Sequence, residues 1–514
     1  MGTNHAYCRL LLLPLIVFFA TVPVSPQSTQ SIAAPTYWPT DGWRSTTPEQ
    51  QGIDSDKLAD ALDYIRKNEI NVHSLLIIRN GYVVLDAYFY PYDEKDLHDI
   101  ASVTKSLTSA LVGIAIGQGK IKAVSQPLLQ LFPGRSIANR EQRKERLTVE
   151  HLLSMTGGLD CKFQSGELTL RQMKQSQDWT QFMLDLPMVA EPGSKFVYCS
   201  GGTHLLSALI SQITGQNELE FARQTLFKPL GITEVLWPSD PQGVNHGWGD
   251  LRMHPRDMAK IGLLWLNRGV WKGKPIVPAS WVDESTRVHA KTSLDSDYGY
   301  GWWVKTHDIP FAYEAVGRGG QRVTVVPSKN LVVVMTGGGF EPSDVRPLLL
   351  PAIKSDQALP ENRARVARLA AALEAATKPP PSNSAPPLPE TARTVSGKSY
   401  LFEANALGLR KLSLTFASPT EAALRLTFMD NHAEVRPVGL DGVPRISPNG
   451  RYGLPAAVKG WWEGPQTFVL DYDEIGNVNH YQIRLKFNGE HVSVEVTERT
   501  HDVEAKFAGK LESE

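Results

Sequence analysis

The sequence predicts an α+β domain, in which an antiparallel sheet is flanked by helices, followed by a small all-β C-terminal domain. Three observations lead to this prediction. Strand-like apolar runs occur at 73–90 and again at 298–335, and helical patterns fill the chain between them. A proline-rich stretch at 378–389 then interrupts the chain. After it, apolar and polar residues alternate as they do in strands that bury one face.

Each element of the α+β domain has a local signal. The Asn80-Gly81 pair between two apolar runs predicts a β-hairpin. The apolar runs are continuous, which predicts a sheet covered on both faces. The predicted helices are at 55–65, 147–155, 201–214, 256–267 and 361–376, and the predicted strands are at 73–79, 82–90, 298–304, 322–326 and 331–335.

These patterns divide the chain into four segments. The first, 1–27, is a predicted signal peptide, because Arg9 precedes an apolar run at 10–20 that is shorter than the ~20 residues of a membrane-spanning helix. The others are the α+β domain at 36–376, a proline-rich linker at 377–393 and the all-β domain, a barrel or a sandwich, at 394–514. We expect an exported protein, periplasmic or secreted, with membrane contact only if the signal segment stays uncleaved.

Charge and composition narrow the class of partner. The 514 residues include 53 Lys and Arg against 54 Asp and Glu, so the net charge is −1. This balance offers no electrostatic surface for nucleic acid, and a small molecule is the more natural partner. The C-terminal part of the sequence has no His and Cys set with the spacing of metal ligands, and the chain contains no His-Glu-x-x-His zinc motif. No cofactor is predicted. The sequence leaves the oligomeric state open.

A helix that opens at Asp99 carries the strongest chemical signal. Ser102 and Lys105 are three residues apart, so their side chains share one helical face, and the chain contains this Ser-x-x-Lys pattern once. A lysine with a lowered pKa can take the proton of a serine hydroxyl and make it a nucleophile. Alone, the pattern equally fits a capping serine followed by a solvated lysine.

Two later stretches add to this signal. Tyr198-Cys199-Ser200 lies where a loop enters a helix, and alone its tyrosine could simply be a packing residue. Gly317-Arg318-Gly319 lies directly before a strand, where glycines allow a substrate close to the backbone, although an ordinary hairpin turn has the same composition.

Together the three stretches resemble the motifs of the β-lactamase and penicillin-binding type of serine hydrolase: a Ser-x-x-Lys helix, a Tyr-x-Ser loop and a strand with a Lys-Thr-Gly-like motif. Their order and spacing are similar to the class C β-lactamase branch. The phrases at 281–284 and 319–321, with Tyr-Cys-Ser, look most like the 6-aminohexanoate-dimer hydrolase group. The resemblance covers residues 45–355 and implies a β-lactamase-like domain.

The resemblance also implies roles for single residues. Ser102 would be the acyl-forming nucleophile, Lys105 its proton acceptor and Tyr198 a second acid/base. We expect the Lys105 ammonium to lower the pKa of the Tyr198 phenol, so that the two titrate as a pair. The backbone N–H groups of Ser102 and of Arg318 or a neighbour would hold the oxyanion. Ser200, with Gly317, Arg318 and Gly319, would contact the substrate.

Two departures from the family pattern shape the expected function. Ser200 replaces an amide side chain of the class C enzymes, and Arg318, or nothing, replaces the lysine of the third motif. Both weaken the case for efficient β-lactam hydrolysis. We expect a serine hydrolase that cleaves an ester or amide through an acyl-enzyme on Ser102. The alternatives are a β-lactamase or D-alanyl carboxypeptidase, and a binding or sensor protein without turnover. The C-terminal domain is expected to be dispensable for chemistry.

Cys161 and Cys199 flank these motifs and are the two cysteines left after removal of the predicted signal peptide. In an exported protein they could form a disulfide. Two buried free thiols are the equal alternative.

Overall fold

The computed structural model describes residues 37–163, 167–308, 310–448, 450, 453–500 and 503–513. They belong to one compact unit, Pro35–Glu514. The predicted signal peptide at 1–27 lies outside the described residues. Among those that are described, no helix combines the length and the apolar character needed to cross a bilayer.

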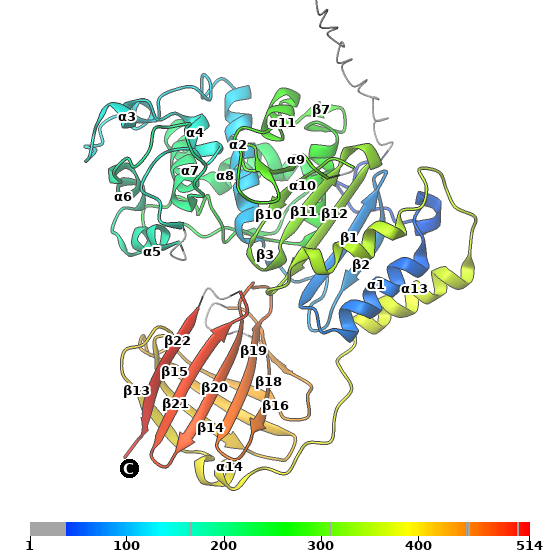
Figure 1. The fold of residues 1–514 in the computed structure, drawn as a ribbon, viewed down its shortest axis with the longest axis vertical. Helices are drawn as coiled ribbons and strands as arrows, with labels where there is room; N and C mark the ends of the chain where they lie inside the picture. Colours follow the sequence, from blue (N-terminus) through cyan, green and yellow to red (C-terminus); the bar gives the residue numbers. More distant parts are fainter. Residues whose placement is uncertain are drawn as a thin grey trace, which may run out of the picture. The chain divides into compact units, whose positions relative to one another are not determined.

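A seven-stranded antiparallel sheet, counted over the described residues, forms the centre of the α+β domain in the order β2-β1-β12-β11-β10-β9-β8 (Figure 1). Its first hairpin turns at Asn80 and Gly81, with φ values of 51° and 81°, which two-residue hairpin turns require. The predicted hairpin is confirmed. The strands are β1 (Val72–Arg79), β2 (Tyr82–Tyr88), β8 (Asp297–Tyr298), β9 (Trp303–Lys305), β10 (Ala312–Val316), β11 (Arg322–Val326) and β12 (Leu331–Gly337).

Both faces of this sheet are covered, as the continuous apolar runs predict. Along β1, Leu75 and Ile77 pack with helices α1 (Ser55–Lys67) and α13 (Arg363–Ala376). The alternate residues Leu76 and Ile78 join the larger core that includes α2 (Thr104–Gly117) and α10 (Pro255–Leu266). Successive strand residues point to opposite faces, so a strand between two helical layers must be apolar throughout.

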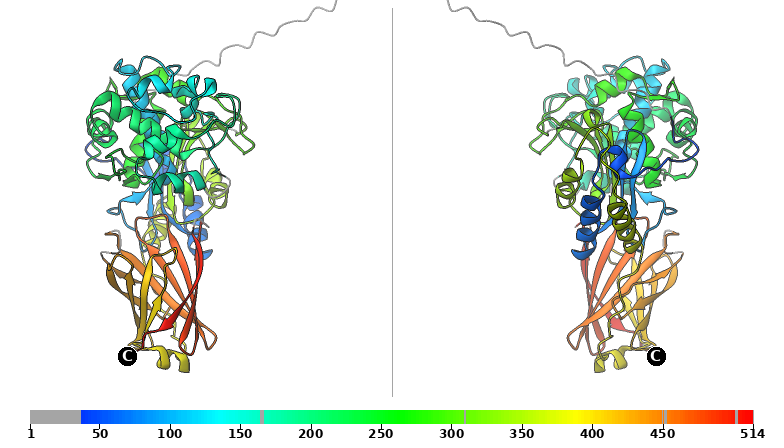
Figure 2. Two further views of the ribbon diagram at one scale, coloured as in Figure 1. Left: turned by 90° about the vertical axis from the view of Figure 1, so that its left-hand side faces the viewer. Right: turned by 90° about the vertical axis from the view of Figure 1, so that its right-hand side faces the viewer.

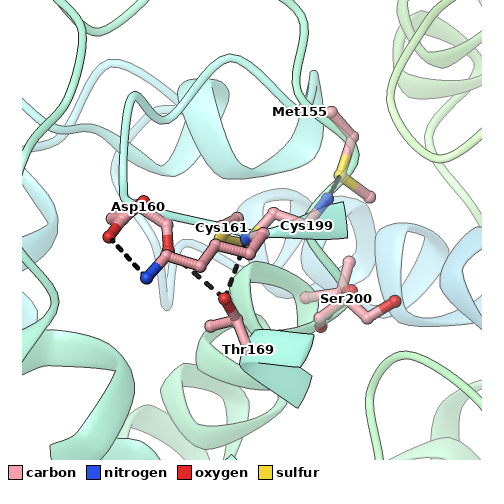
Figure 3. The surroundings of a disulfide bond; sticks show 8 residues. Met155, Asp160, Cys161, Thr169, Cys199 and Ser200 are labelled. Carbon is pink, nitrogen blue, oxygen red and sulfur yellow. Dashed lines mark hydrogen bonds and ion pairs between the residues drawn. A yellow bond between two sulfur atoms is a disulfide. The ribbon is translucent and has the colours of Figure 1, made fainter. Parts of the chain in front are cut away.

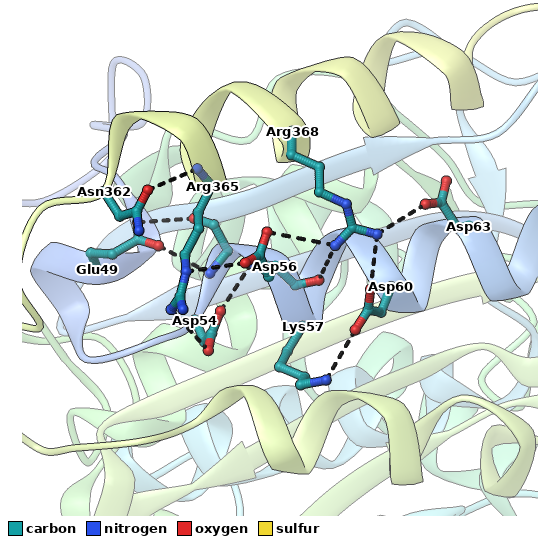
Figure 4. A network of polar contacts seen from close by, with 10 residues as sticks. Glu49, Asp54, Asp56, Lys57, Asp60, Asp63, Asn362, Arg365 and Arg368 are labelled. Atoms are coloured by element: carbon teal, nitrogen blue, oxygen red, sulfur yellow. Dashed lines mark hydrogen bonds and ion pairs between the residues drawn. The ribbon is translucent and has the colours of Figure 1, made fainter.

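Helices α1 and α13 lie side by side on one face of the sheet (Figure 2). Arg368 of α13 forms ion pairs with Asp56, Asp60 and Asp63 of α1, at 3.6, 2.8 and 3.4 Å (Figure 4). Exposed ion pairs contribute only about 0–1 kcal/mol each, so the apolar contacts dominate the packing of the two helices. Helix α1, near the start of the α+β domain, is thereby joined to α13 at its end.

The strand predicted at 298–304 is wrong in one respect: it is interrupted. A turn separates β8 from β9, with a hydrogen bond from Gly299 N–H to Trp302 O at 2.8 Å and Gly301 at φ 78°. A side chain on Gly301 would lie 2.9 Å from Lys105 O, so only glycine lets this turn approach α2. Ser106 of α2 donates its hydroxyl hydrogen to Gly301 O at 2.6 Å.

The helical layer of the larger core holds the segments that carry the candidate site. Helix α7 packs against α2. The remaining helices of this domain are α3 (Gln142–Glu145), α4 (Val149–Leu153), α5 (Leu168–Gln175), α6 (Trp179–Asp185), α7 (Ser200–Thr214), α8 (Glu218–Ala222), α9 (Lys228–Leu230), α11 (Ala279–Ser285) and α12 (Arg346–Leu349). The short strands are β3 (His98–Asp99), β4 (Val235–Leu236), β5 (Arg252–Met253), β6 (Val270–Trp271) and β7 (Lys274–Pro275).

The C-terminal domain is a barrel, which decides between the two predicted all-β architectures. Its described residues form a ten-stranded sheet in the order β16-β15-β14-β13-β22-β21-β20-β19-β18-β17, and β16 also pairs with β18. The barrel encloses an apolar core that includes Leu424, Phe468 and Val492. The elements are α14 (Glu390–Val395), β13 (Ser399–Phe402), β14 (Leu409–Phe416), β15 (Glu421–Phe428), β16 (Ala433–Gly439), β17 (Arg445–Ser447), β18 (Ala456–Glu463), β19 (Thr467–Glu474), β20 (His480–Asn488), β21 (His491–Glu498) and β22 (Glu504–Leu511). The boundaries at 376, 377, 393 and 394 stay predictions.

Candidate active site

Ser102 lies just before the main helix rather than inside it. Residues Ala101–Val103 form a 3₁₀ turn, η2, and α2 begins at Thr104. This places the side chains of Ser102 and Lys105 one turn apart, and Lys105 Nζ donates a hydrogen bond to Ser102 Oγ at 2.8 Å. Lys105 Nζ donates a second one to Trp248 O at 2.8 Å. The expected contact between the two side chains is therefore present.

Lys105 is a buried cation with a lowered affinity for protons. Its side chain is 1% exposed. Burial lowers its pKa to about 8, and the carboxylates of Glu167 and Asp250 partly oppose this shift. An ammonium taken out of water loses hydration energy, which favours the neutral amine. A lysine with such a pKa is partly neutral near physiological pH and can accept the proton of the adjacent hydroxyl.

Tyr198 lies beside this pair, but its titration differs from the expectation. Lys105 Nζ is 4.8 Å from the centre of the Tyr198 ring, over the aromatic face. Burial raises the pKa of the phenol well above its usual value, Tyr298 and Glu167 add to the rise, and the Ser102 hydroxyl opposes it. The expected lowering by the ammonium is thus wrong, because desolvation of the phenolate dominates. Tyr198 is held as a neutral phenol.

Aromatic rings and a disulfide fix the position of Tyr198. Its ring stacks on Trp303 at 6.3 Å and lies 5.1 Å from the ring of Phe163. Cys161 and Cys199 form a disulfide, the first of the two alternatives for this pair (Figure 3). The bond links the segment that carries Phe163 to the residue that follows Tyr198. The aromatic contacts and this covalent link restrain the phenol on both sides.

Ser200 is the first residue of α7 and is 3% exposed. Among the described residues its hydroxyl has no hydrogen-bond partner. A depression of about 200 Å³ is lined by Ser200, Tyr198 and Glu167 together with Cys161, Lys162, Phe163, Thr169, Leu170, Cys199 and Gly201. A buried hydroxyl without a partner is costly unless a ligand satisfies it, which makes Ser200 a candidate substrate contact.

A second depression, of about 270 Å³, shares the disulfide as part of its wall. It is lined mainly by α4 and the loop after it, including His151, Leu152 and Met155. The smaller depression is the one lined by Tyr198 and Ser200, whereas Ser102 and Lys105 line neither of the two.

The third motif lies against the nucleophile turn. A side chain on Gly317, at the end of β10, would lie 2.5 Å from Ile100 O and 3.1 Å from Ala101 Cβ. Glycine is therefore required for this close approach. Gln321 stabilises the chain corner formed by Gly317–Gly319. Its side-chain amide donates a hydrogen bond to Arg318 O at 3.1 Å and accepts one from Gly337 N–H at 3.1 Å. Gly317 thus lies against the turn that carries Ser102, whereas Gly319 lies near Val478 and Gly337.

The side chain of Arg318 does not take the place of the family's lysine. Its guanidinium donates to Thr500 Oγ1 and, at 3.0 Å, to Asn479 Oδ1, and lies 3.6 Å from Glu498 Oε2. These three partners belong to the C-terminal barrel. The charge of Arg318 is thus compensated by barrel residues.

Several contributors to this site have no signal in the sequence. The carbonyl of Trp248 orients Lys105, but any residue supplies a carbonyl. Glu167 directly precedes α5, far from Lys105 in the sequence, and its carboxylate raises the pKa of Lys105. For Trp303, which packs on Tyr198, the sequence offers no signal beyond its position in a predicted strand. In the part of the chain that the structure describes, no three His, Cys, Asp or Glu side chains group as metal ligands do.

Residues 60–356 match the family described as Beta-lactamase. The 6-aminohexanoate-dimer hydrolase of Paenarthrobacter ureafaciens is 23% identical over 318 residues, which cover 58% of this chain and 80% of that protein. A protein of Salmonella paratyphi B whose name proposes a D-alanyl-D-alanine carboxypeptidase is 23% identical over 372 residues, covering 57% and 85%.

Among solved structures, the octameric penicillin-binding protein homologue from Pyrococcus abyssi is 16% identical, with a TM-score of 0.48, and the alignment covers 88% of this chain and 99% of that one. The matched family spans more than half of the chain and includes Ser102, Lys105, Tyr198 and the third motif. The chain therefore belongs to the Beta-lactamase family, and it is a serine hydrolase of the β-lactamase and penicillin-binding type.

Proposed function

We propose that this protein hydrolyses an ester or amide through a covalent acyl-enzyme on Ser102. The observation that carries the proposal is the 2.8 Å hydrogen bond between Lys105 Nζ and Ser102 Oγ, made by a lysine whose burial lowers its pKa to about 8. A buried, partly neutral amine in contact with a hydroxyl is the arrangement that generates a serine nucleophile.

In the first step, neutral Lys105 accepts the hydroxyl proton as Ser102 Oγ bonds to the substrate carbonyl carbon. The carbonyl oxygen becomes an oxyanion, which the backbone N–H of Ser102 and one from the Gly317–Gly319 segment would stabilise. When the intermediate collapses, the bond to the leaving group breaks. The Tyr198 phenol protonates the leaving group, and the Lys105 ammonium returns a proton to Tyr198.

The high pKa of Tyr198 supports the role of acid in this step, since a phenol that resists ionisation stays available as a donor. Deacylation repeats the sequence with water. Water gives a proton to Lys105 and attacks the acyl carbon, and Ser102 Oγ leaves and recovers the proton. Lys105 serves as base in both halves.

The environment of Arg318 favours a substrate without a carboxylate next to the scissile bond. Arg318 contacts Asn479, Thr500 and Glu498, so its charge is already compensated. A β-lactam or D-alanyl peptide brings a carboxylate that needs a free cation. We therefore favour a simple ester or amide over the β-lactamase and carboxypeptidase alternatives.

Export is a further part of the proposal. The Cys161–Cys199 disulfide supports it, because such bonds persist in oxidising compartments. The predicted signal peptide points the same way.

The test compares three substrates: a short-chain p-nitrophenyl ester, a linear p-nitroanilide and a nitrocefin-like lactam. We expect a burst of nitrophenol followed by steady turnover, with the ester or anilide preferred to the lactam. Ser102→Ala should abolish both phases. Ser109→Ala, on the same helix and with a hydroxyl that has no partner among the described residues, is the matched control and should retain them. A burst without turnover would indicate the sensor alternative, and equal activity of Ser102→Ala and the native protein would end the proposal.

A further inference from the structure

The C-terminal barrel contacts the segment that leads into the nucleophile. The backbone N–H of Asp99 donates a hydrogen bond to Gly476 O at 2.9 Å, in the turn between β19 and β20. Gly476 has φ 83°, and a side chain there would lie 2.6 Å from Leu97 O. The turn therefore needs glycine to approach this closely.

From Asp99 the restraint continues to Ser102. One carboxylate oxygen of Asp99 accepts a hydrogen bond from Ala101 N–H at 2.7 Å. Ala101 has φ 46°, a left-handed conformation that a residue with a side chain rarely adopts. An Asp99 side chain held in place stabilises this conformation one residue before the nucleophile.

The same end of the barrel holds the third motif. Arg318 contacts Asn479, next to β20, and Glu498 and Thr500, at the end of β21. Glu498 is fully buried and also accepts a hydrogen bond from Thr500 N–H at 2.9 Å. Hydrogen bonds in which one partner is charged are roughly twice as strong as neutral ones, so this cluster ties Arg318 to the barrel.

Glycine again marks the close approach between the two parts. A side chain on Gly319 would lie 2.4 Å from Val478 Cγ1, within the same barrel turn. On its other side the corner meets the nucleophile turn through Gly317. The Gly317–Gly319 corner is thus packed between the Ser102 turn and the barrel.

We propose that the barrel positions the catalytic backbone, with Arg318 as the positioning residue and Asn479, Thr500 and Glu498 as its anchor. This inference rests on the proposed function of Ser102. The anchor sets where the Gly317–Gly319 backbone stands relative to Ser102, and the Gly476–Asp99 hydrogen bond sets the turn itself. A shift of the oxyanion donors by a fraction of an ångström reduces stabilisation of the transition state. The barrel contacts argue against the expectation that this domain is dispensable.

The test removes two of the three anchoring side chains, those of Asn479 and Thr500, without touching the proposed catalytic groups. In the full chain we would make the double variant Asn479→Ala with Thr500→Ala, together with Thr500→Ser, which keeps a hydroxyl. The matched control is Arg484→Ala, which removes a barrel ion pair with Glu463 at 3.0 Å. Ser102 is titrated with a fluorophosphonate, which counts the reactive sites, and the acylation rate with the p-nitrophenyl ester is then expressed per site.

We expect the double variant to keep about one reactive site per chain. Its acylation rate constant should fall about tenfold or more, and kcat should change more than KM. Thr500→Ser should recover at least half of the native rate constant, and Arg484→Ala should stay within twofold of it. A native rate constant in the double variant would overturn the proposal.

If the double variant does not fold, the acylation rate constants per site of Thr500→Ala and Thr500→Ser are compared instead. Equal values overturn the proposal, and a value at least threefold lower in Thr500→Ala supports it. Failure of the proposed function looks different, because then the native protein itself shows no acylation at Ser102.

Discussion

The ammonium of Lys105 lies over the face of the Tyr198 ring, 4.8 Å from its centre. A cation above an aromatic face is attracted to the ring as a whole. This arrangement stabilises a charged Lys105 while leaving Tyr198 protonated. In the proposed mechanism the two residues therefore have separate tasks, Lys105 as base and Tyr198 as acid.

The first prediction concerns pH. Because neutral Lys105 is the base, kcat/KM for an ester should rise with pH and level off above about 8, where the pKa of Lys105 lies. The Glu167 carboxylate raises that pKa, so Glu167→Gln should lower it and move the midpoint to lower pH. Glu191→Gln, which removes an exposed partner of Arg146, should leave the midpoint unchanged. A midpoint in Glu167→Gln at or above the native one would contradict the assignment of the base.

The second prediction concerns Tyr198. Tyr198→Phe removes the proton donor but keeps the ring that packs on Trp303 and Phe163. We expect kcat to fall about 10²–10⁴-fold, the usual contribution of a general acid, with little change in Tm. Tyr298→Phe makes the same chemical change in the neighbouring buried tyrosine and should keep kcat within about threefold. Equal losses in both variants would point to packing rather than acid catalysis.

The third prediction concerns the disulfide. Cys161 and Cys199 are 38 residues apart, and closing a loop of that length stabilises a protein by about 3–4 kcal/mol. Reduction, or replacement of both cysteines by serine, should lower the free energy of unfolding by an amount of this order. It should also lower kcat, because the Phe163 segment is no longer tied to Tyr198. Denaturant titration and ester turnover measure the two effects, and thiol titration of the native protein under denaturing conditions checks that the bond is present.

The fourth prediction concerns Glu218, a fully buried carboxyl at the start of α8. Burial raises its pKa from 4.5 to about 8, with only partial opposition from the hydroxyls of Ser207 and Thr108. Between these pH values the folded state holds more protons than the unfolded state, so stability should fall as the pH rises from 4.5 to 8.

Glu218→Gln removes this dependence. The Tm of the variant relative to the native protein should therefore increase from pH 5 to pH 9. Glu220→Gln, at an exposed position on the same helix, is the control and should show no such trend. A constant Tm difference for Glu218→Gln across this range would mean that the buried carboxyl does not titrate there.

The sequence predicts those parts of the site that depend on local spacing. Ser102 and Lys105 are in contact because they are one helical turn apart, and Asn80-Gly81 forms a turn because both residues tolerate positive φ. Strands β1, β2, β11 and β12 are recognisable because both helical layers demand apolar residues, whereas β10, with Glu314 in its middle, was not predicted. These features need no knowledge of the rest of the fold.

What the sequence could not predict depends on contacts between distant segments. The direction of the Tyr198 pKa shift follows from desolvation of the phenol in the folded chain, which no short motif specifies. The partners of Arg318 lie 161 and 182 residues further along the chain. Trp248 contributes only its backbone carbonyl, which any residue could supply, so no sequence motif identifies it.

The pairing of β1 with β12 has a consequence for biosynthesis. The Ser74 and Thr336 hydroxyls share a 2.7 Å hydrogen bond although 262 residues separate them. A ribosome that adds about 5–20 residues per second makes β12 roughly 13–50 s after β1. During that interval the first hairpin has no neighbour on its β12 edge, and the core that buries Lys105 is incomplete. The turn that carries Ser102 is thus synthesised early, whereas the sheet that supports it closes only after β12 has been made.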